Sequence, residues 1–196
     1  MKYISYLLFF LFISALLYFL KNALEPHKEA IVITGSDKCG ECHNLKNIGD
    51  QFTIWKNSEH SGAYTVLFSN KARDFASKNG LQAPEKEEKC LKCHSTAYSL
   101  KGMEKGESFN ISEGVGCEAC HGAGSGYSPA EIMRDEGLFI RNGGIKGEAS
   151  TCSPCHNTKG SKEQVLKDDL CPFQEEDFDY KQEFEKIKHP LNKDLK

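Results

Sequence analysis

Eight of the nine cysteines in this chain of 196 residues stand in pairs, and each pair is followed directly by a histidine. The resulting pentads are CGECH (39–43), CLKCH (90–94), CEACH (117–121) and CSPCH (152–156). Two thiols three positions apart can add to the two vinyl groups on one edge of a porphyrin, and the next residue places an imidazole where it can ligate the iron. The four pentads therefore predict four haem c groups, each with its iron.

The cysteine pairs could alternatively form structural zinc sites, because C-x-x-C segments with nearby histidines also bind zinc. Zinc sites of four cysteines each would need no histidine, yet one follows every pair, although only 7 of 196 residues are histidine. The odd number of cysteines also excludes a complete set of intramolecular disulfides. We therefore favour haem, and the residues predicted to hold the rings are Cys39, Cys42, Cys90, Cys93, Cys117, Cys120, Cys152 and Cys155.

The histidines have to serve both faces of four irons. The predicted proximal ligands are the motif histidines, namely His43, His94, His121 and His156. Only His27, His60 and His189 remain for the distal faces, so three side chains are left for four places. Unless Met103, Met133, a lysine or a neighbouring chain contributes, at least one iron is five-coordinate or binds water. We predict His60 and His189 as distal ligands, whereas His27 is either a distal ligand or a solvated linker residue.

The remaining pattern predicts a mostly α fold with long irregular loops. Apolar residues recur every three or four positions over residues 50–68, which predicts an amphipathic helix with His60 on its apolar face. A second helix is expected over residues 178–191, with Pro190 ending it after His189. Strand signals are poor, and glycine-rich loops are expected at 102–116, 122–128 and 142–147. With roughly 40 residues per haem, the haems must form much of the core.

The amino terminus indicates export. Lys2 precedes an apolar run over residues 4–20, a length close to that of a bilayer span and longer than a usual signal-peptide core. We expect one N-terminal transmembrane helix acting as a signal anchor, with a cleaved signal peptide or a buried helix as alternatives. The predicted division is 1–21 signal anchor or signal peptide, 22–38 linker and 39–196 tetrahaem domain. The predicted location is the periplasmic side of the bacterial inner membrane, or the soluble periplasm if the segment is cleaved.

Net charge, an acidic run and the ninth cysteine are the remaining features of the sequence. With 25 basic and 28 acidic residues, the net charge of −3 argues against binding of nucleic acid. An acidic run over residues 175–179 is either a solvated face or a surface that attracts a basic redox partner. Cys171 is either a thiol available for intermolecular contact or a small, partly buried apolar residue.

The order of motifs resembles a known family, the tetrahaem cytochromes c of the cytochrome c five-five-four type. The resemblance rests on CGECH, Trp55-x-x-Ser58-x-His60, CLKCH, Gly114-Val115-Gly116 before CEACHGAG, CSPCH, and a C-terminal helix ending Ile187-Lys188-His189. It covers Cys39 to about Leu191. It implies a helical periplasmic electron carrier with stacked haem pairs, in which His60 and His189 match distal ligands.

The chain also departs from that family. Relatives usually carry a further distal histidine a few residues after the third pentad, and residues 123–134 contain none. Since the family already leaves one haem without a distal protein ligand, two irons are open here unless His27 substitutes. Tyr127 either lines the vacant face or is a packed tyrosine.

Three functions are consistent with these observations. We favour electron transfer between a membrane quinol oxidoreductase or similar donor and a periplasmic redox protein, because no acid–base cluster marks a substrate site. An enzyme is therefore less expected than a carrier. The second hypothesis is an enzyme or sensor that uses a five-coordinate haem to act on nitric oxide, nitrite or hydroxylamine. The third is a subunit of a cytochrome filament. The sequence does not indicate an oligomeric state.

Overall fold

The structure is a computed structural model that describes residues 2–24, 30–156 and 178–190. Contacts divide the chain into two compact units, Met1–Ala30 and Ile31–Lys196, and each is described by itself. The first unit contains helix α1 (Lys2–Leu24). In the described part of the chain, no helix is both long enough and apolar enough to cross a membrane. The structure thus does not support the transmembrane helix predicted at the amino terminus.

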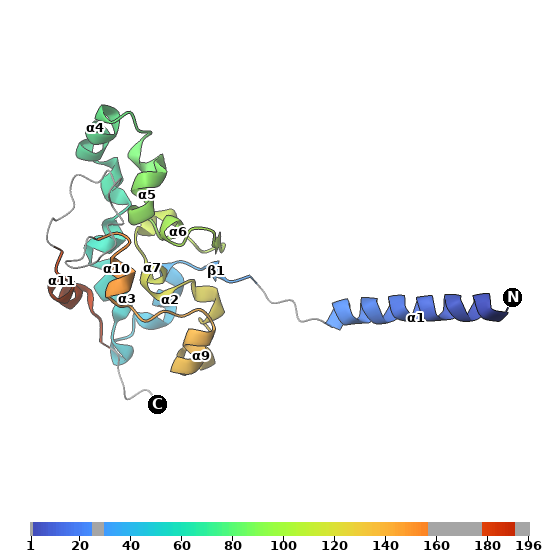
Figure 1. Cartoon of the computed structure of the whole chain (residues 1–196). Helices are drawn as coiled ribbons and strands as arrows, with labels where there is room; N and C mark the ends of the chain where they lie inside the picture. The colour runs from blue at the N-terminus through green and yellow to red at the C-terminus, as the bar shows by residue number, and fades with distance from the viewer. Residues whose placement is uncertain (1, 25–29, 157–177, 191–196) are drawn as a thin grey trace. The chain divides into compact units, whose positions relative to one another are not determined.

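The second unit is built from short helices joined by loops (Figure 1). Its α-helices are α2 (Ser36–His43), α3 (Gln51–Lys56), α4 (Asn70–Lys78), α5 (Glu88–His94), α6 (Thr96–Ser99), α7 (Cys117–His121), α8 (Ala130–Met133), α9 (Glu136–Arg141), α10 (Ala149–Cys152) and α11 (Tyr180–Ile187). Its 3-10 helices are η1 (Lys46–Ile48), η2 (Glu59–Gly62), η3 (Thr65–Phe68), η4 (Pro84–Lys86), η5 (Ile111–Glu113) and η6 (Gly124–Gly126). The mostly helical fold class is therefore confirmed.

Two very short strands complete the second unit. Strand β1 (Val32–Ile33) pairs in parallel with β2 (Glu104–Lys105), with Val32 opposite Glu104. This pairing brings the chain before the first pentad against the loop that leads to the third. The weak strand signals in the sequence agree with such a minimal sheet.

The helix predicted over residues 50–68 is wrong as a continuous element. It is split into α3, η2 and η3, because Ser58 is extended at φ −88° and ψ 162° and its hydroxyl donates to Trp55 O. The next turn, η2, is fixed by a distant segment of the chain, since Val115 N–H donates to His60 O at 2.9 Å. His60 therefore lies in a turn that a distant loop fixes, and helical periodicity does not position it.

The helix predicted near the carboxyl terminus is present as α11. Asp179 caps it by accepting hydrogen bonds from the N–H groups of Lys181 and Gln182. The helix ends at Ile187, two residues before His189, and Pro190 follows.

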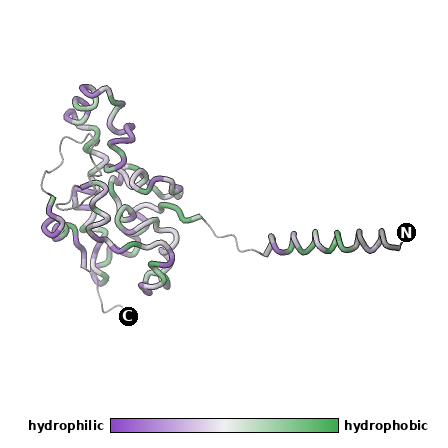
Figure 2. The backbone as a smooth tube through the Cα atoms, in the orientation of Figure 1, coloured by the Kyte–Doolittle hydropathy of each residue, from purple (hydrophilic) through white to green (hydrophobic). Residues whose placement is uncertain are grey.

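The apolar core of the described residues is small. Its buried apolar side chains are Ile33, Leu67, Ala76, Leu91, Ala97, Ala123 and Tyr127. Figure 2 shows hydrophilic and hydrophobic residues closely interspersed along this unit. So few buried apolar side chains form a small core for a unit of this length.

Candidate haem centres

Each pentad lies at the end of a short helix. Helices α2, α5 and α7 end at the histidines of the first three pentads, and α10 ends at Cys152 of the fourth. In the fourth pentad the helical turn continues, because the N–H groups of Cys155 and His156 both donate to Cys152 O. Helical spacing puts residues three apart on one face, so each pair of thiols can reach one edge of a flat ring.

Hydrogen bonds orient the motif imidazoles. The Nδ1 atom of His43 lies 3.2 Å from Gln51 Oε1, that of His94 lies 2.6 Å from Ala63 O, and that of His121 lies 3.0 Å from Ile145 O. Since each partner is an acceptor, Nδ1 carries the proton and Nε2 keeps its lone pair for a metal. This is the usual arrangement of a histidine that ligates a metal.

Two further histidines lie opposite motif histidines. The ring centres of His60 and His156 are 6.0 Å apart, and those of His121 and His189 are 5.8 Å apart. With a metal–nitrogen bond of about 2 Å on each side and about 1 Å from nitrogen to ring centre, two imidazoles on one metal have centres about 6 Å apart. Both pairs thus have the spacing needed to hold one iron between them.

Burial favours the neutral, ligating form of these imidazoles. The pKa of His60 is lowered by burial and further by nearby His156. The pKa of His121 is lowered by burial, partly opposed by its bond to Ile145. The pKa of His189 is lowered by burial and then by His121 and His43. Because a metal binds neutral imidazole, these shifts favour metal binding near neutral pH.

The cysteines of different pentads approach one another. The pKa of Cys39 is raised mainly by its interaction with Cys117, and that of Cys155 mainly by its interaction with Cys93. Burial raises the pKa of Cys120 to about 11, and nearby Cys152 adds to it. The first pentad therefore lies against the third, the third against the fourth, and the fourth against the second.

A glycine allows the loop before the third pentad to approach the turn that carries His60. Gly114 has φ +70°, and a Cβ atom there would lie 2.6 Å from His60 O. A side chain at this position would therefore collide with the backbone of the turn that carries His60. This explains the glycine in the Gly114-Val115-Gly116 segment. Trp55 Nε1 also donates to Val115 O at 2.8 Å.

The sequence is similar to known cytochromes. Residues 38–122, which include the first three pentads, match the profile of the family described as cytochrome c554 and c-prime. The chain is also 28% identical over 156 residues to a cytochrome c-554 of Nitrosomonas europaea. Both matches support a c554-type multihaem cytochrome family for this chain.

This alignment covers 71% of the chain and 64% of the relative. No solved structure matches the chain significantly. The likeness to this family supports covalently bound haem c with its iron as the cofactor. The paired imidazoles, oriented Nδ1 atoms and facing thiols fit that cofactor.

The other predicted site residues have different outcomes. His27 and Cys171 lie outside the described residues, as does most of the acidic run at 175–179. Met103 and Met133 are both exposed. Among the described residues, no group of three or more His, Cys, Asp or Glu side chains is arranged to hold a metal ion by itself.

Tyr127 is a packed tyrosine. Its hydroxyl donates to Gly122 O at 2.7 Å, and its ring contacts Phe139 with centres 4.8 Å apart. Only 4% of the residue is exposed. The structure therefore supports the second of the two alternatives for this residue.

Sequence reasoning missed Gln51, which links two centres. Its Oε1 accepts from His43, and its Nε2 donates to Pro190 O at 2.9 Å and to Ile48 O. One buried amide thus orients a motif histidine and fixes the segment that carries His189. No local signal could reveal this, since Pro190 is 139 residues away.

Sequence reasoning also missed Glu118, the second residue of the third pentad. It is fully buried and accepts hydrogen bonds from the N–H groups of Thr34, Gly35 and Gly124. A charged residue inside a pentad was the available signal. Its partners in the segment before the first pentad could be found only from the fold.

Proposed function

We propose that the protein binds four haem c groups and relays electrons between a membrane quinol-linked donor and a periplasmic redox protein. The observation that carries this proposal is the continuous series of contacts between pentads: α7 of the third packs against α2 of the first and α10 of the fourth, and Cys155 of the fourth interacts with Cys93 of the second. Bound haem iron would supply one-electron chemistry at each pentad. The small apolar core supports the expectation that haems form much of the interior.

The proposed ligand assignment follows the imidazole pairs. His156 and His60 serve the fourth iron, and His121 and His189 serve the third. His43 and His94 serve the first and second irons. Among the described residues, no histidine then remains for the distal faces of those two irons, which stand at the two ends of the series. Two imidazoles per iron give low potentials, so the middle of the series would hold the more reducing centres.

The phenyl ring of Phe178 supports the assignment at the fourth centre. It stacks on His156 with ring centres 4.4 Å apart and planes 18° apart. This contact restricts rotation of the imidazole. The ring therefore contributes to orienting His156.

The proposed location is the periplasm, because c-type haem is attached outside the bacterial cytoplasm. A decisive experiment counts electrons and haems in one purified sample of the full chain. We expect four haems per chain and uptake of four electrons in anaerobic titration, followed by complete reoxidation by an oxidised soluble cytochrome c. Fewer than four haems, or a fraction that the acceptor leaves reduced, would contradict the relay.

The ligand count also favours a second candidate function. An iron without a distal imidazole can bind a small molecule, so an enzyme or sensor for nitric oxide, nitrite or hydroxylamine is a further proposal. Its test is steady-state consumption of each compound by the protein while an excess of a chemical reductant re-reduces the haems, against a control with reductant but no protein. Turnover that exceeds the stoichiometric electron content of the sample would support catalysis, and a single stoichiometric event would exclude it.

A further inference from the structure

Two glutamates lie beside the contact between the first and third pentads. Glu118 Oε1 accepts from Thr34 N–H at 2.8 Å, and Oε2 accepts from Gly35 N–H at 2.7 Å. The N–H group of Gly124 and the hydroxyl of Thr34 also donate to Oε1. Both oxygens act only as acceptors, as they do in an ionised carboxylate. Glu118 therefore presents a negative charge held in place by the backbone.

Glu113 lies close to it. Its Oε2 accepts from Ser36 N–H at 2.7 Å, and its Oε1 accepts from the Thr96 hydroxyl at 3.4 Å. Ser36 in turn accepts from Cys117 N–H at 3.1 Å, which connects this carboxyl to the third pentad. Burial raises the pKa of Glu113, and the charge of Glu118 adds to that effect.

The surroundings of the two carboxyls are poor in positive charge. The groups that face Glu113 are Ser36 from α2, Thr96 from α6, Glu118 and Cys117 from α7, and Cys39 from α2. In helix η2, the backbone carbonyl of His60 accepts a hydrogen bond from the N–H group of Val115, in the loop that follows Glu113. Neither glutamate takes part in any ion pair seen among the described residues.

Both charges act on the ring-holding cysteines. The pKa of Cys39 is raised by Cys117, by burial, and by the charges of Glu118 and Glu113. In the holoprotein these sulfurs are thioethers, so this shift matters only as evidence that the carboxylates lie within electrostatic range. A negative charge near a haem stabilises the ferric over the ferrous iron and lowers its reduction potential.

We propose that Glu113 and Glu118 lower the reduction potentials of the two haems attached through Cys39 and Cys117. This inference rests on the proposed function, since it requires haem at both pentads. Reduction adds one electron from the redox donor to a ferric iron. The added charge favours uptake of one proton from water by Glu113, which returns the proton on reoxidation. The potentials of these two haems should therefore fall as pH rises.

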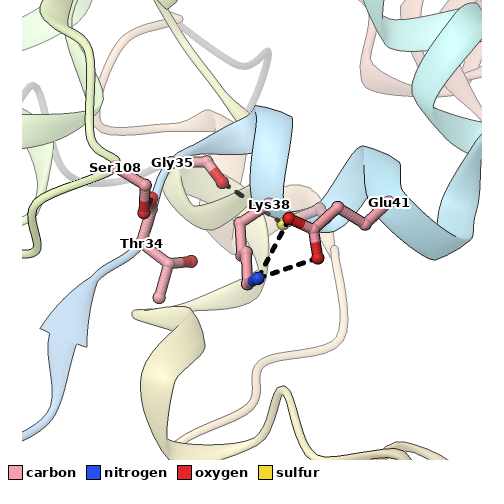
Figure 3. Close-up of polar contacts among 6 residues, drawn as sticks. Thr34, Gly35, Lys38, Glu41 and Ser108 are labelled. Atoms are coloured by element: carbon pink, nitrogen blue, oxygen red, sulfur yellow. Dashed lines mark hydrogen bonds and ion pairs between the residues drawn. The ribbon is translucent and has the colours of Figure 1, made fainter.

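The test compares Glu113→Gln, Glu118→Gln and Glu41→Gln in the full-length holoprotein. Glu41 is the matched control, because it belongs to the first pentad but is exposed and paired with Lys38 at 2.8 Å (Figure 3). The measurement is a potentiometric titration followed by visible absorption and electron paramagnetic resonance, at several pH values. Haem content is counted first in every sample.

We expect Glu113→Gln to favour the ferrous form of two haems about tenfold, which is about 59 mV for a one-electron couple. Glu118→Gln should shift the same haems in the same direction, and Glu41→Gln should leave them unchanged. The pH dependence of these two potentials should weaken in Glu113→Gln.

Potentials and pH profiles in Glu113→Gln that match those of Glu41→Gln would overturn the proposal. If Glu118→Gln loses haem because its backbone contacts fail, the potentials and pH profile of Glu113→Gln decide the question. Wild-type protein without haem at these pentads would instead refute the proposed function itself.

Discussion

Replacement of Gln51 by leucine tests how the first and third centres are linked. The amide is buried, with 8% of the residue exposed, and it contacts His43 Nδ1 at 3.2 Å and Pro190 O at 2.9 Å. Leucine has a similar volume but neither accepts nor donates a hydrogen bond. Each buried polar group left without a partner costs about 1–3 kcal/mol, so we expect Gln51→Leu to lower the free energy of unfolding by roughly 3 kcal/mol.

The assay is guanidinium unfolding of the oxidised holoprotein followed by circular dichroism. Gln82→Leu is the matched control, because that side chain is exposed and only its backbone N–H contacts Glu87. We expect the control to stay within about 0.5 kcal/mol of wild type. A Gln51→Leu protein as stable as the control would refute the bridging role.

A second variant separates the two bonds of Gln51. Gln51→Glu keeps an acceptor for His43 but removes the donor to Pro190. We expect it to keep the His43 contact and to loosen the segment that carries His189, which reduces the low-spin signal of the third haem in electron paramagnetic resonance. An unchanged signal would show that the bond to Pro190 does not position His189.

Three further predictions concern the pentads and their partners. His60→Ala and His189→Ala should each convert one haem to high spin without loss of covalent haem, as electron paramagnetic resonance and mass spectrometry can show; only low-spin haem in both variants would contradict the assignment. Cys42→Ala should reduce covalent attachment of the first haem, seen as a lower mass, and unchanged haem content would argue against this pentad as an attachment site. Gly114→Ala should destabilise the fold by more than 1 kcal/mol, because it adds a Cβ atom at positive φ against His60 O, and should reduce the low-spin signal of the fourth haem.

The pentads could be predicted to bind haem from sequence because covalent attachment needs only local spacing. His60 and His189 could be identified from sequence as candidate ligands. Which motif histidine each one faces could not be predicted, because His156 and His121 are distant from them in the chain and come close only in the fold. The helix predicted over residues 50–68 is wrong as a continuous element because Ser58 is extended and a hydrogen bond from Val115 fixes the following turn at His60. The spacing of apolar residues along the segment carries no information about that bond.

The buried polar groups were hidden for the same physical reason. Gln51 and Glu118 look like ordinary surface residues in sequence, because polar side chains are usually solvated. Their roles depend on donors and acceptors that come from remote loops, such as Thr34 and Pro190. Such contacts become visible only when the chain is folded.

The most direct test of the account is electron paramagnetic resonance of the oxidised full-length holoprotein before and after addition of nitric oxide, with haem counted in the same sample. The account predicts four haems, low-spin signals from the paired imidazoles of the third and fourth centres, and a high-spin signal that nitric oxide abolishes. A purely low-spin spectrum that nitric oxide leaves unchanged would contradict the histidine assignment, because every iron would then have a second ligand.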